Sequence, residues 1–178
     1  MRKIYALLLA MAAALLSFTV AGSPASGQPS PRSSVQAQAE QILHNHPGGV
    51  QISPTQIAWH NGTVILNLQT PARGASPNTS FDGCPSGYYC FFEFKNFTGR
   101  MLQLSTCDST PIYFSDYGFQ NLTSSWVVFR NIYYLNIYEQ LSPSGWNFLW
   151  SEPAYAAQSD VGATWDNRAD LVDCFPPR

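Results

Sequence analysis

CPSGYYCFFEFKNFTGRMLQLSTC, residues 84–107, is the stretch that decides the fold of this chain. Two cysteines close together, Cys84 and Cys90, frame the start of an aromatic run that is typical of a β-strand. A turn built on KNFTG, residues 95–99, separates this run from a second strand-like segment that begins at Arg100. The stretch therefore predicts a β-hairpin anchored by a short disulfide.

The composition favours a single domain with many turns and gives no sign of a polyanionic partner. Of the 178 residues, 11% are charged and 14% are aromatic, and the formal net charge is −2. A chain without a basic excess has no general electrostatic attraction for nucleic acid or an anionic membrane. Thirteen prolines and twelve glycines predict many turns.

The first 21 residues are interpreted as a secretory signal peptide. Arg2 and Lys3 form a basic start, Ala6–Leu16 form an apolar core, and a small-residue cleavage site ends at Ala21. No later apolar run approaches the length of a membrane span. We therefore expect a secreted, extracellular protein that has no contact with the membrane after cleavage.

The next part of the chain is predicted to be a small α-β-β extension. Residues 35–46 have a modest apolar stripe that favours a helix, which Pro47 and the following glycines would end. Two strand-like runs follow, joined by Asn61 and Gly62, and Asn-Gly is the strongest short hairpin signal. The predicted boundaries are a signal peptide at 1–21, a disordered linker at 22–34, the extension at 35–69, a linker at 70–81 and the main domain at 82–175.

Four cysteines lie in the part of the chain that would be exported: Cys84, Cys90, Cys107 and Cys174. An even number in an exported chain predicts two disulfides, and four cysteines allow three pairings. The short spacing favours Cys84–Cys90, which leaves Cys107–Cys174. Zinc binding is disfavoured because there is no CxxC pair, and the three histidines lie far away in the extension.

The main domain is predicted to be all-β. Short apolar runs alternate with turn residues, which is typical of a sandwich or barrel. The expected strands are 88–94, 100–104, 124–130, 133–138, 147–150 and 170–174. No helical period appears after residue 47.

An internal repeat divides this domain into two halves. Phe92 is followed after six residues by Gly99, and Tyr138 is followed in the same way by Gly145. A small-polar segment follows later in each half, at 120–127 and 166–172. This spacing predicts a duplicated supersecondary unit in which each glycine allows a backbone conformation that other residues avoid.

These motifs resemble the Greek-key motif of βγ-crystallins, and the opening CPSGYYC resembles secreted bacterial metalloproteinase inhibitors, peptidase inhibitor family thirty-six. The resemblance implies two Greek-key motifs forming a βγ-crystallin-like sandwich over about 82–175. It also implies a peptidase inhibitor that binds an extracellular protease, expected to be a thermolysin-like metalloproteinase.

The resemblance further implies a reactive loop in the later half of the domain. Inhibitory relatives clamp this loop with a second local disulfide, whereas this sequence has no second close cysteine pair. A loop that is held rigid loses less entropy on binding. The corresponding residues here are Ser142, Pro143, Ser144, Gly145, Trp146 and Asn147.

Calcium binding is an alternative function implied by the crystallin resemblance. Oxygen atoms of the small-polar segments coordinate the ion in βγ-crystallins, and calcium prefers such hard ligands. The residues that match are Asn121, Ser124, Asp166, Asn167 and Asp170, with Glu93 and Glu139 as further donors. The same residues also suit turns and strand starts, where they cap the backbone.

A third interpretation is a protein that binds cell-wall glycan. Trp146, Trp150 and Trp165 fall in or beside expected loops, where indole rings can stack on sugars. An enzyme is not expected, because the chain contains neither a G-x-S-x-G elbow nor an H-E-x-x-H motif.

Overall fold

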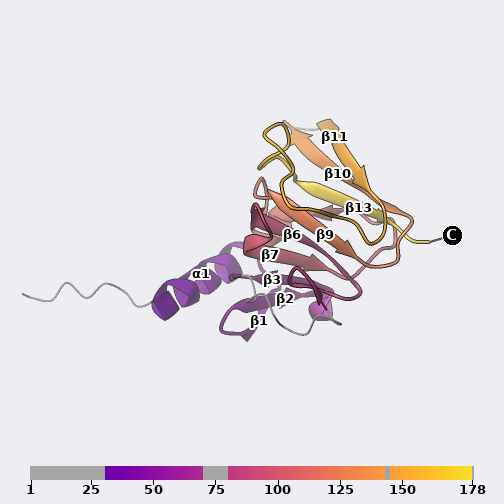
Figure 1. Ribbon diagram of the computed structural model, residues 1–178. Helices are drawn as coiled ribbons and strands as arrows, with labels where there is room; N and C mark the ends of the chain where they lie inside the picture. Colours follow the sequence, from indigo (N-terminus) through magenta and orange to yellow (C-terminus); the bar gives the residue numbers. More distant parts are fainter. Residues whose placement is uncertain (1–30, 70–79, 143–144, 178) are drawn as a thin grey trace, which may run out of the picture.

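The computed structural model describes residues 31–69, 80–142 and 145–177 (Figure 1). The predicted signal peptide lies outside these residues. None of the described helices is long and apolar enough to cross a membrane. The helical elements are α1 (Pro31–Asn45) and two short 3-10 segments, η1 (His60–Gly62) and η2 (Phe114–Tyr117).

Most of the described chain is β-structure. The strands are β1 (Val50–Ser53), β2 (Gln56–Trp59), β3 (Val64–Asn67), β4 (Ser80–Phe81), β5 (Cys84–Pro85), β6 (Tyr88–Phe94), β7 (Thr98–Leu104), β8 (Ile112–Tyr113), β9 (Ser125–Phe129), β10 (Tyr134–Leu141), β11 (Gly145–Glu152), β12 (Ala157–Gln158) and β13 (Leu171–Phe175). The six strands expected in the main domain are therefore all present. The two-residue strands β4, β5, β8 and β12 were missed, because so short a segment has no alternation to detect.

Two antiparallel sheets build the domain, and they exchange their edge strands. The larger sheet has the order β1-β2-β3-β7-β6-β9-β12, and the smaller has the order β11-β10-β13-β8. Strand β8 belongs to the first half of the sequence but pairs with β13 of the second half. Strand β12 belongs to the second half but pairs with β9 of the first. This exchange confirms the predicted sandwich of two Greek-key motifs.

The space between the sheets is filled by aromatic and aliphatic side chains. They alternate with outward-facing residues along each strand, as the pleat requires. Fully buried members of this core include Phe91, Leu102, Phe114, Phe119, Leu135, Ile137 and Val172. The opening stretch supplies a second, smaller cluster, formed by Cys84, Cys90, Phe92, Phe97, Met101 and Val127.

The N-terminal extension continues the larger sheet. Strand β3 pairs with β7 along four residues, so β2 and β1 lie beyond it at the sheet edge (Figure 1). The structure thus shows three strands here, whereas α-β-β predicts two. Helix α1 begins at Pro31, within the stretch expected to be a linker, and proline is favoured in the first turn of a helix.

Two disulfides are present, and their pairing is the one that the spacing favours. Cys84 bonds to Cys90 and joins β5 to β6, while Cys107 bonds to Cys174 and joins the segment after β7 to β13. The second bridge closes a much longer loop and links the two halves of the domain. No free cysteine occurs among the described residues.

Candidate functional site

The two halves of the domain present two hairpins, which are held by equivalent hydrogen bonds. We call β6–β7 the first hairpin and β10–β11 the second hairpin. The Ser124 N–H donates to the Phe92 carbonyl at 2.9 Å, and the Asp170 N–H donates to the Tyr138 carbonyl at 2.9 Å. Both donors belong to the small-polar segments of the repeat. The repeat seen in the sequence therefore forms the same contact twice.

The two small-polar segments also bond directly to each other. The Asn121 N–H donates to the Ala169 carbonyl at 3.1 Å, and the Asn167 N–H donates to the Thr123 carbonyl at 3.0 Å. Asn121 and Asn167 both adopt left-handed backbone angles, which asparagine tolerates better than most residues. These reciprocal bonds tie the two motifs together between the hairpins.

The tip of the first hairpin folds back, and its backbone is bonded to other parts of the chain although Phe94 remains 57% exposed. The Ser125 hydroxyl donates to the Phe94 carbonyl at 2.7 Å and accepts from the Phe97 N–H at 3.1 Å. The Asn96 N–H donates to the Ser159 carbonyl at 2.8 Å. This tip is therefore occupied by contacts within the chain.

The second hairpin has a different tip. Pairing continues to Leu141 and Gly145, so the strands run straight to the end. Gly145 does not have the positive φ of Gly99, and the expectation that the two glycines are conformationally equivalent is wrong. The cause is the extended pairing, which holds Gly145 in the ladder and leaves no folded-back turn.

Each hairpin carries an arginine–glutamate ion pair, which the sequence did not reveal. In the first hairpin Arg100 donates to both carboxylate oxygens of Glu93, at 3.0 and 2.9 Å. Burial by itself would raise the pKa of Glu93, but the bonds from Arg100 outweigh it and lower the pKa. These two residues are close in sequence and lie within one hairpin.

In the second hairpin the arginine comes from a distant segment. Arg168 donates to Glu139 at 2.8 and 2.6 Å, and these bonds lower the pKa of Glu139. The Asp170 carboxylate also accepts the Gln140 N–H at 2.8 Å. The segment at 166–171 therefore clamps the second hairpin, and no sequence signal pairs Arg168 with Glu139, because tertiary folding alone brings them together.

The residues expected to form the inhibitory loop lie at the tip of the second hairpin. Ser142 follows the end of β10, and Gly145, Trp146 and Asn147 begin β11. Pro143 and Ser144 lie outside the described residues. Around this tip Leu141 is 50% exposed, Trp146 is 40% exposed and Phe148 is 52% exposed.

The residues expected to bind calcium are mainly engaged in bonds within the fold. The Ser124 hydroxyl donates to the Glu93 carbonyl at 2.9 Å, and Asp170 is buried against the second hairpin. Burial raises the pKa of Asp170. One buried carboxylate oxygen of Asp166, and likewise one of Asp170, has no hydrogen-bond partner among the described residues. No group of three or more His, Cys, Asp or Glu residues with metal-binding geometry occurs in the described part of the chain.

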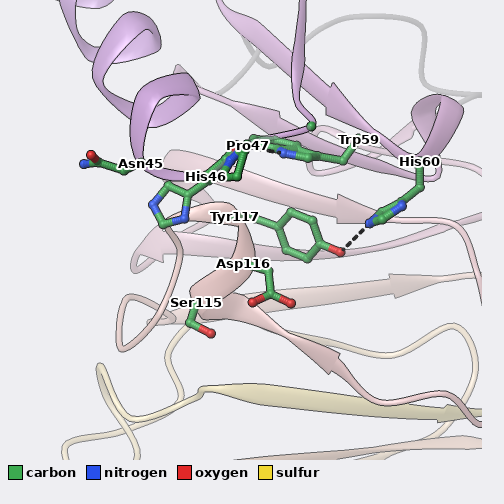
Figure 2. Close-up of a pocket in the computed structure, with 9 residues that line it drawn as sticks. Asn45, His46, Pro47, Trp59, His60, Ser115, Asp116 and Tyr117 are labelled. Carbon is green, nitrogen blue, oxygen red and sulfur yellow. Dashed lines mark hydrogen bonds between the residues drawn. The ribbon is translucent and has the colours of Figure 1, made fainter.

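A cavity of about 630 Å³ lies where the extension meets the main domain (Figure 2). His60 Nε2 lies 3.1 Å from the Tyr117 hydroxyl, and the Trp59 indole N–H donates to the His46 carbonyl at 3.3 Å. Figure 2 shows Ser115 and Asp116 on the opposite wall from the histidines. The His60–Tyr117 bond joins the extension to η2, and the Trp59–His46 bond holds the extension together, which gives the cavity wall a structural role.

The three tryptophans considered for glycan binding are separated by the fold. Trp146 lies at the second hairpin, where its ring centroid is 5.6 Å from that of Tyr113. Trp150 is buried on β11 and packs against Trp165 with centroids 5.6 Å apart. The structure therefore groups Trp150 with Trp165 and leaves Trp146 elsewhere.

These observations define a disulfide-linked protein of two Greek-key motifs with one hairpin tip folded back and the other extended. Residues 77–150 match the sequence model of Inhibitor_I36, peptidase inhibitor family I36. The matched region includes the first hairpin and the second hairpin as far as Trp150. Because the family consists of inhibitors, the expectation that the protein is not an enzyme is confirmed.

Comparison with whole proteins adds little to this assignment. No curated protein matches the sequence. One solved structure, described as "Evolution of the eye lens beta-gamma-crystallin domain fold", is 14% identical in sequence, with a TM-score of 0.40. The alignment covers 56% of this chain and 96% of that chain.

Proposed function

We propose that this protein is exported and inhibits an extracellular peptidase, a thermolysin-like metalloproteinase, through the tip of its second hairpin. The family match supports inhibition as the activity. The signal-like N-terminus and two disulfides support export, since disulfides persist in oxidising compartments. The observation that carries the choice of hairpin is the contrast between the two tips: the first folds back and its backbone is bonded to Ser125 and Ser159, whereas the second extends as a paired ladder to Leu141 and Gly145.

The bonds from residues 166–171 to the second hairpin support the choice of this hairpin as the inhibitory element. A loop inhibitor must hold its binding conformation before it meets the peptidase, since ordering a loose loop reduces affinity. Arg168 and Asp170 fix Glu139 and Gln140 near the tip without a local disulfide. Charge-assisted, bidentate bonds of this kind are among the stronger polar contacts in proteins.

The apolar residues around the tip supply contact area for a partner. Leu141, Trp146 and Phe148 expose large side chains near the end of the second hairpin. Aromatic anchors at the centre of an interface commonly carry most of the binding free energy. In this arrangement the hairpin enters the peptidase cleft as an extended segment, and the paired strands keep it from relaxing after contact.

The experiment is an inhibition assay of a thermolysin-like metalloproteinase with the purified protein and two arginine variants. Arg168→Met removes the clamp on the second hairpin and is expected to raise the inhibition constant about tenfold. Arg100→Met removes the equivalent ion pair from the first hairpin and is the matched control, expected to stay within about twofold. Circular dichroism establishes that both variants are folded.

Three results decide the outcome. Loss of inhibition in Arg168→Met alone supports the proposed hairpin. Equal losses in the two variants would contradict it, because inhibition would then follow general stability. Inhibition of a subtilisin-type serine peptidase without any effect on the metalloproteinase would keep the family-level activity and overturn the proposed target.

Calcium binding is a second candidate, favoured by the buried and unpartnered oxygen of Asp166. Buried carboxylate oxygens normally have a donor or a cation beside them. Calcium would supply that partner, with Asn121, Ser124, Asn167 and Asp170 in the same pair of segments. A rise in melting temperature with millimolar calcium that Asp166→Asn abolishes would support the site. An unchanged melting temperature would remove it.

A further inference from the structure

A second, smaller cavity of about 250 Å³ lies at the open side of the sandwich, where the edge strands of the two sheets face each other. Strand β11 is the edge of the smaller sheet, and β12 is the edge of the larger one. The cavity is lined by Trp126, Trp150, Glu152, Gln158, Val161 and Trp165. These residues come from both sheets and from the segment after β12, so only the folded domain assembles them.

Three indole rings and the Val161 side chain form the apolar part of this cavity, which we call the tryptophan pocket. Trp126 and Trp150 are 4% and 6% exposed, whereas Trp165 is 39% exposed. The planes of Trp150 and Trp165 are tilted by 34° with centroids 5.6 Å apart. The two buried rings therefore build the back of the pocket, and Trp165 is the ring that an incoming molecule can reach.

Two polar groups of the pocket, the Trp150 N–H and the Glu152 carboxyl, lack a hydrogen-bond acceptor and an ion-pair partner respectively among the described residues. The indole N–H of Trp150 is buried and has no hydrogen-bond partner among the described residues. Such donors usually find an acceptor, because a buried donor left unpaired destabilises the folded state. Glu152 likewise forms no ion pair within the described part of the chain, and burial raises the pKa of its carboxyl to about 7.

The carboxamide of Gln158 completes the polar lining. Its nitrogen donates to the Asp160 carbonyl at 2.7 Å, which fixes the orientation of the side chain. The pocket thus combines ring faces with an unpaired donor, a carboxyl group and an oriented amide. This combination requires a ligand that is apolar on its faces and both donates and accepts hydrogen bonds at its edge.

We propose that the tryptophan pocket binds a single pyranose ring of a glycan. The C–H face of a pyranose packs on an indole, while its hydroxyl groups accept from the Trp150 N–H and donate to the Glu152 carboxyl. The volume lies below the range for drug-sized ligands, which limits the occupant to about one ring. This site is separate from the hairpin tip and does not depend on peptidase inhibition.

An alkylammonium ligand is the principal competitor, because indole faces and a carboxylate also attract cations. A quaternary ammonium group has no acceptor to offer, so the Trp150 N–H would stay unpaired. The sugar ring satisfies both unpartnered groups and the cation satisfies one. The structure therefore favours the sugar.

The test measures binding of the full protein to an array of immobilised oligosaccharides built from glucose, galactose, mannose, N-acetylglucosamine and N-acetylgalactosamine, with soluble choline as the cation probe. Trp165→Ala is expected to weaken glycan binding at least about tenfold. Trp165 is chosen because it is exposed, so its removal leaves the core intact. Glu152→Gln keeps hydrogen-bonding capacity and is expected to weaken binding only a few-fold.

Trp146→Ala is the matched control, because Trp146 is 40% exposed but lies at the second hairpin. It is expected to retain glycan binding, whereas the proposed function predicts that it loses peptidase inhibition. Trp165→Ala should show the reverse pattern, which separates failure of one proposal from failure of the other. Near-ultraviolet circular dichroism and melting curves confirm that each variant is folded.

Three results would overturn the proposal. The first is absence of binding to every oligosaccharide by folded wild-type protein. The second is equal loss of glycan binding in Trp146→Ala and Trp165→Ala, which would place the site elsewhere. The third is binding of choline alone, abolished by Glu152→Gln, which would make the pocket a cation site.

Discussion

At the scale of single residues, Gly99 occupies a position where a single added Cβ atom would cause strain. Its φ is +83°, and a Cβ at this position would lie 2.7 Å from Cδ2 of Phe94. Both the backbone angle and the space therefore exclude a side chain. The ring that occupies this space belongs to Phe94, whereas the aromatic residue of the aromatic-x6-Gly pattern is Phe92, so that pattern does not report this contact directly.

Replacing Gly99 with alanine is expected to destabilise the protein by about 2–4 kcal/mol, from backbone strain and overpacking together. Gly62→Ala is the control, because Gly62 has φ of +86° but nothing lies within 4 Å of the added Cβ. It should cost only about 1–2 kcal/mol. Urea unfolding of both variants measures the difference, and equal losses would show that the Phe94 contact is unimportant.

Glu152 gives the protein a pH-dependent stability. Its pKa is raised from 4.5 to about 7 by burial, so the folded state holds a proton that the unfolded state releases between these values. The free energy of unfolding should therefore fall as pH rises through this window. Urea unfolding at pH 5 and pH 8 measures this fall in the free energy of unfolding. The Glu152→Gln variant should lack the part of the fall that Glu152 causes. Identical pH profiles for wild type and variant would contradict this assignment.

At the scale of elements, the first hairpin depends on a serine from another strand. The Ser125 hydroxyl, fully buried at the start of β9, joins the Phe94 carbonyl to the Phe97 N–H across the folded turn. The hairpin and β9 are distant in sequence. The turn therefore keeps its shape only when the sheet has formed.

Ser125→Ala should leave the part-buried Phe94 carbonyl and the buried Phe97 N–H without this partner and destabilise the protein by about 1–3 kcal/mol. Ser151→Ala is a suitable control, since Ser151 donates to the Leu135 carbonyl from an exposed position. Its removal should cost less than about 0.5 kcal/mol. Thermal unfolding compares the two, and a loss at Ser125 no larger than at Ser151 would refute the role of the buried bridge.

At the scale of the whole molecule, the extension and the main domain share one core. Ile57, Trp59 and Leu66 of the extension belong to the same buried cluster as Phe91 and Leu104 of the domain. Strand β3 also covers the edge of β7, which would otherwise present unpaired backbone groups. Residues 35–69 are therefore part of the folded unit in this structure.

Leu66→Ala is expected to destabilise the entire protein by about 2–5 kcal/mol, because Leu66 is fully buried in the shared core. Val50→Ala is the control in the same extension, since Val50 is 64% exposed. Far- and near-ultraviolet circular dichroism should report one transition at a lower temperature for Leu66→Ala. Two separate transitions would show that the extension unfolds independently of the domain.

The sequence by itself determined the local features of this protein. Alternating apolar residues placed the six long strands of the domain, the short cysteine spacing favoured Cys84–Cys90, and the aromatic-x6-Gly pattern located both hairpins. Each of these signals lies within a few residues of chain. Local sterics and the period of the strand are sufficient to produce them.

Only the tertiary structure decided how these local features combine. It exchanged β8 and β12 between the sheets, paired Arg168 with Glu139 and gathered three tryptophans around Glu152. It also folded one hairpin tip back onto Ser125 and Ser159 and left the other extended, although their motifs are alike. The physical reason is that contacts between distant segments depend on the packing of both sheets, and no short-range pattern encodes that packing.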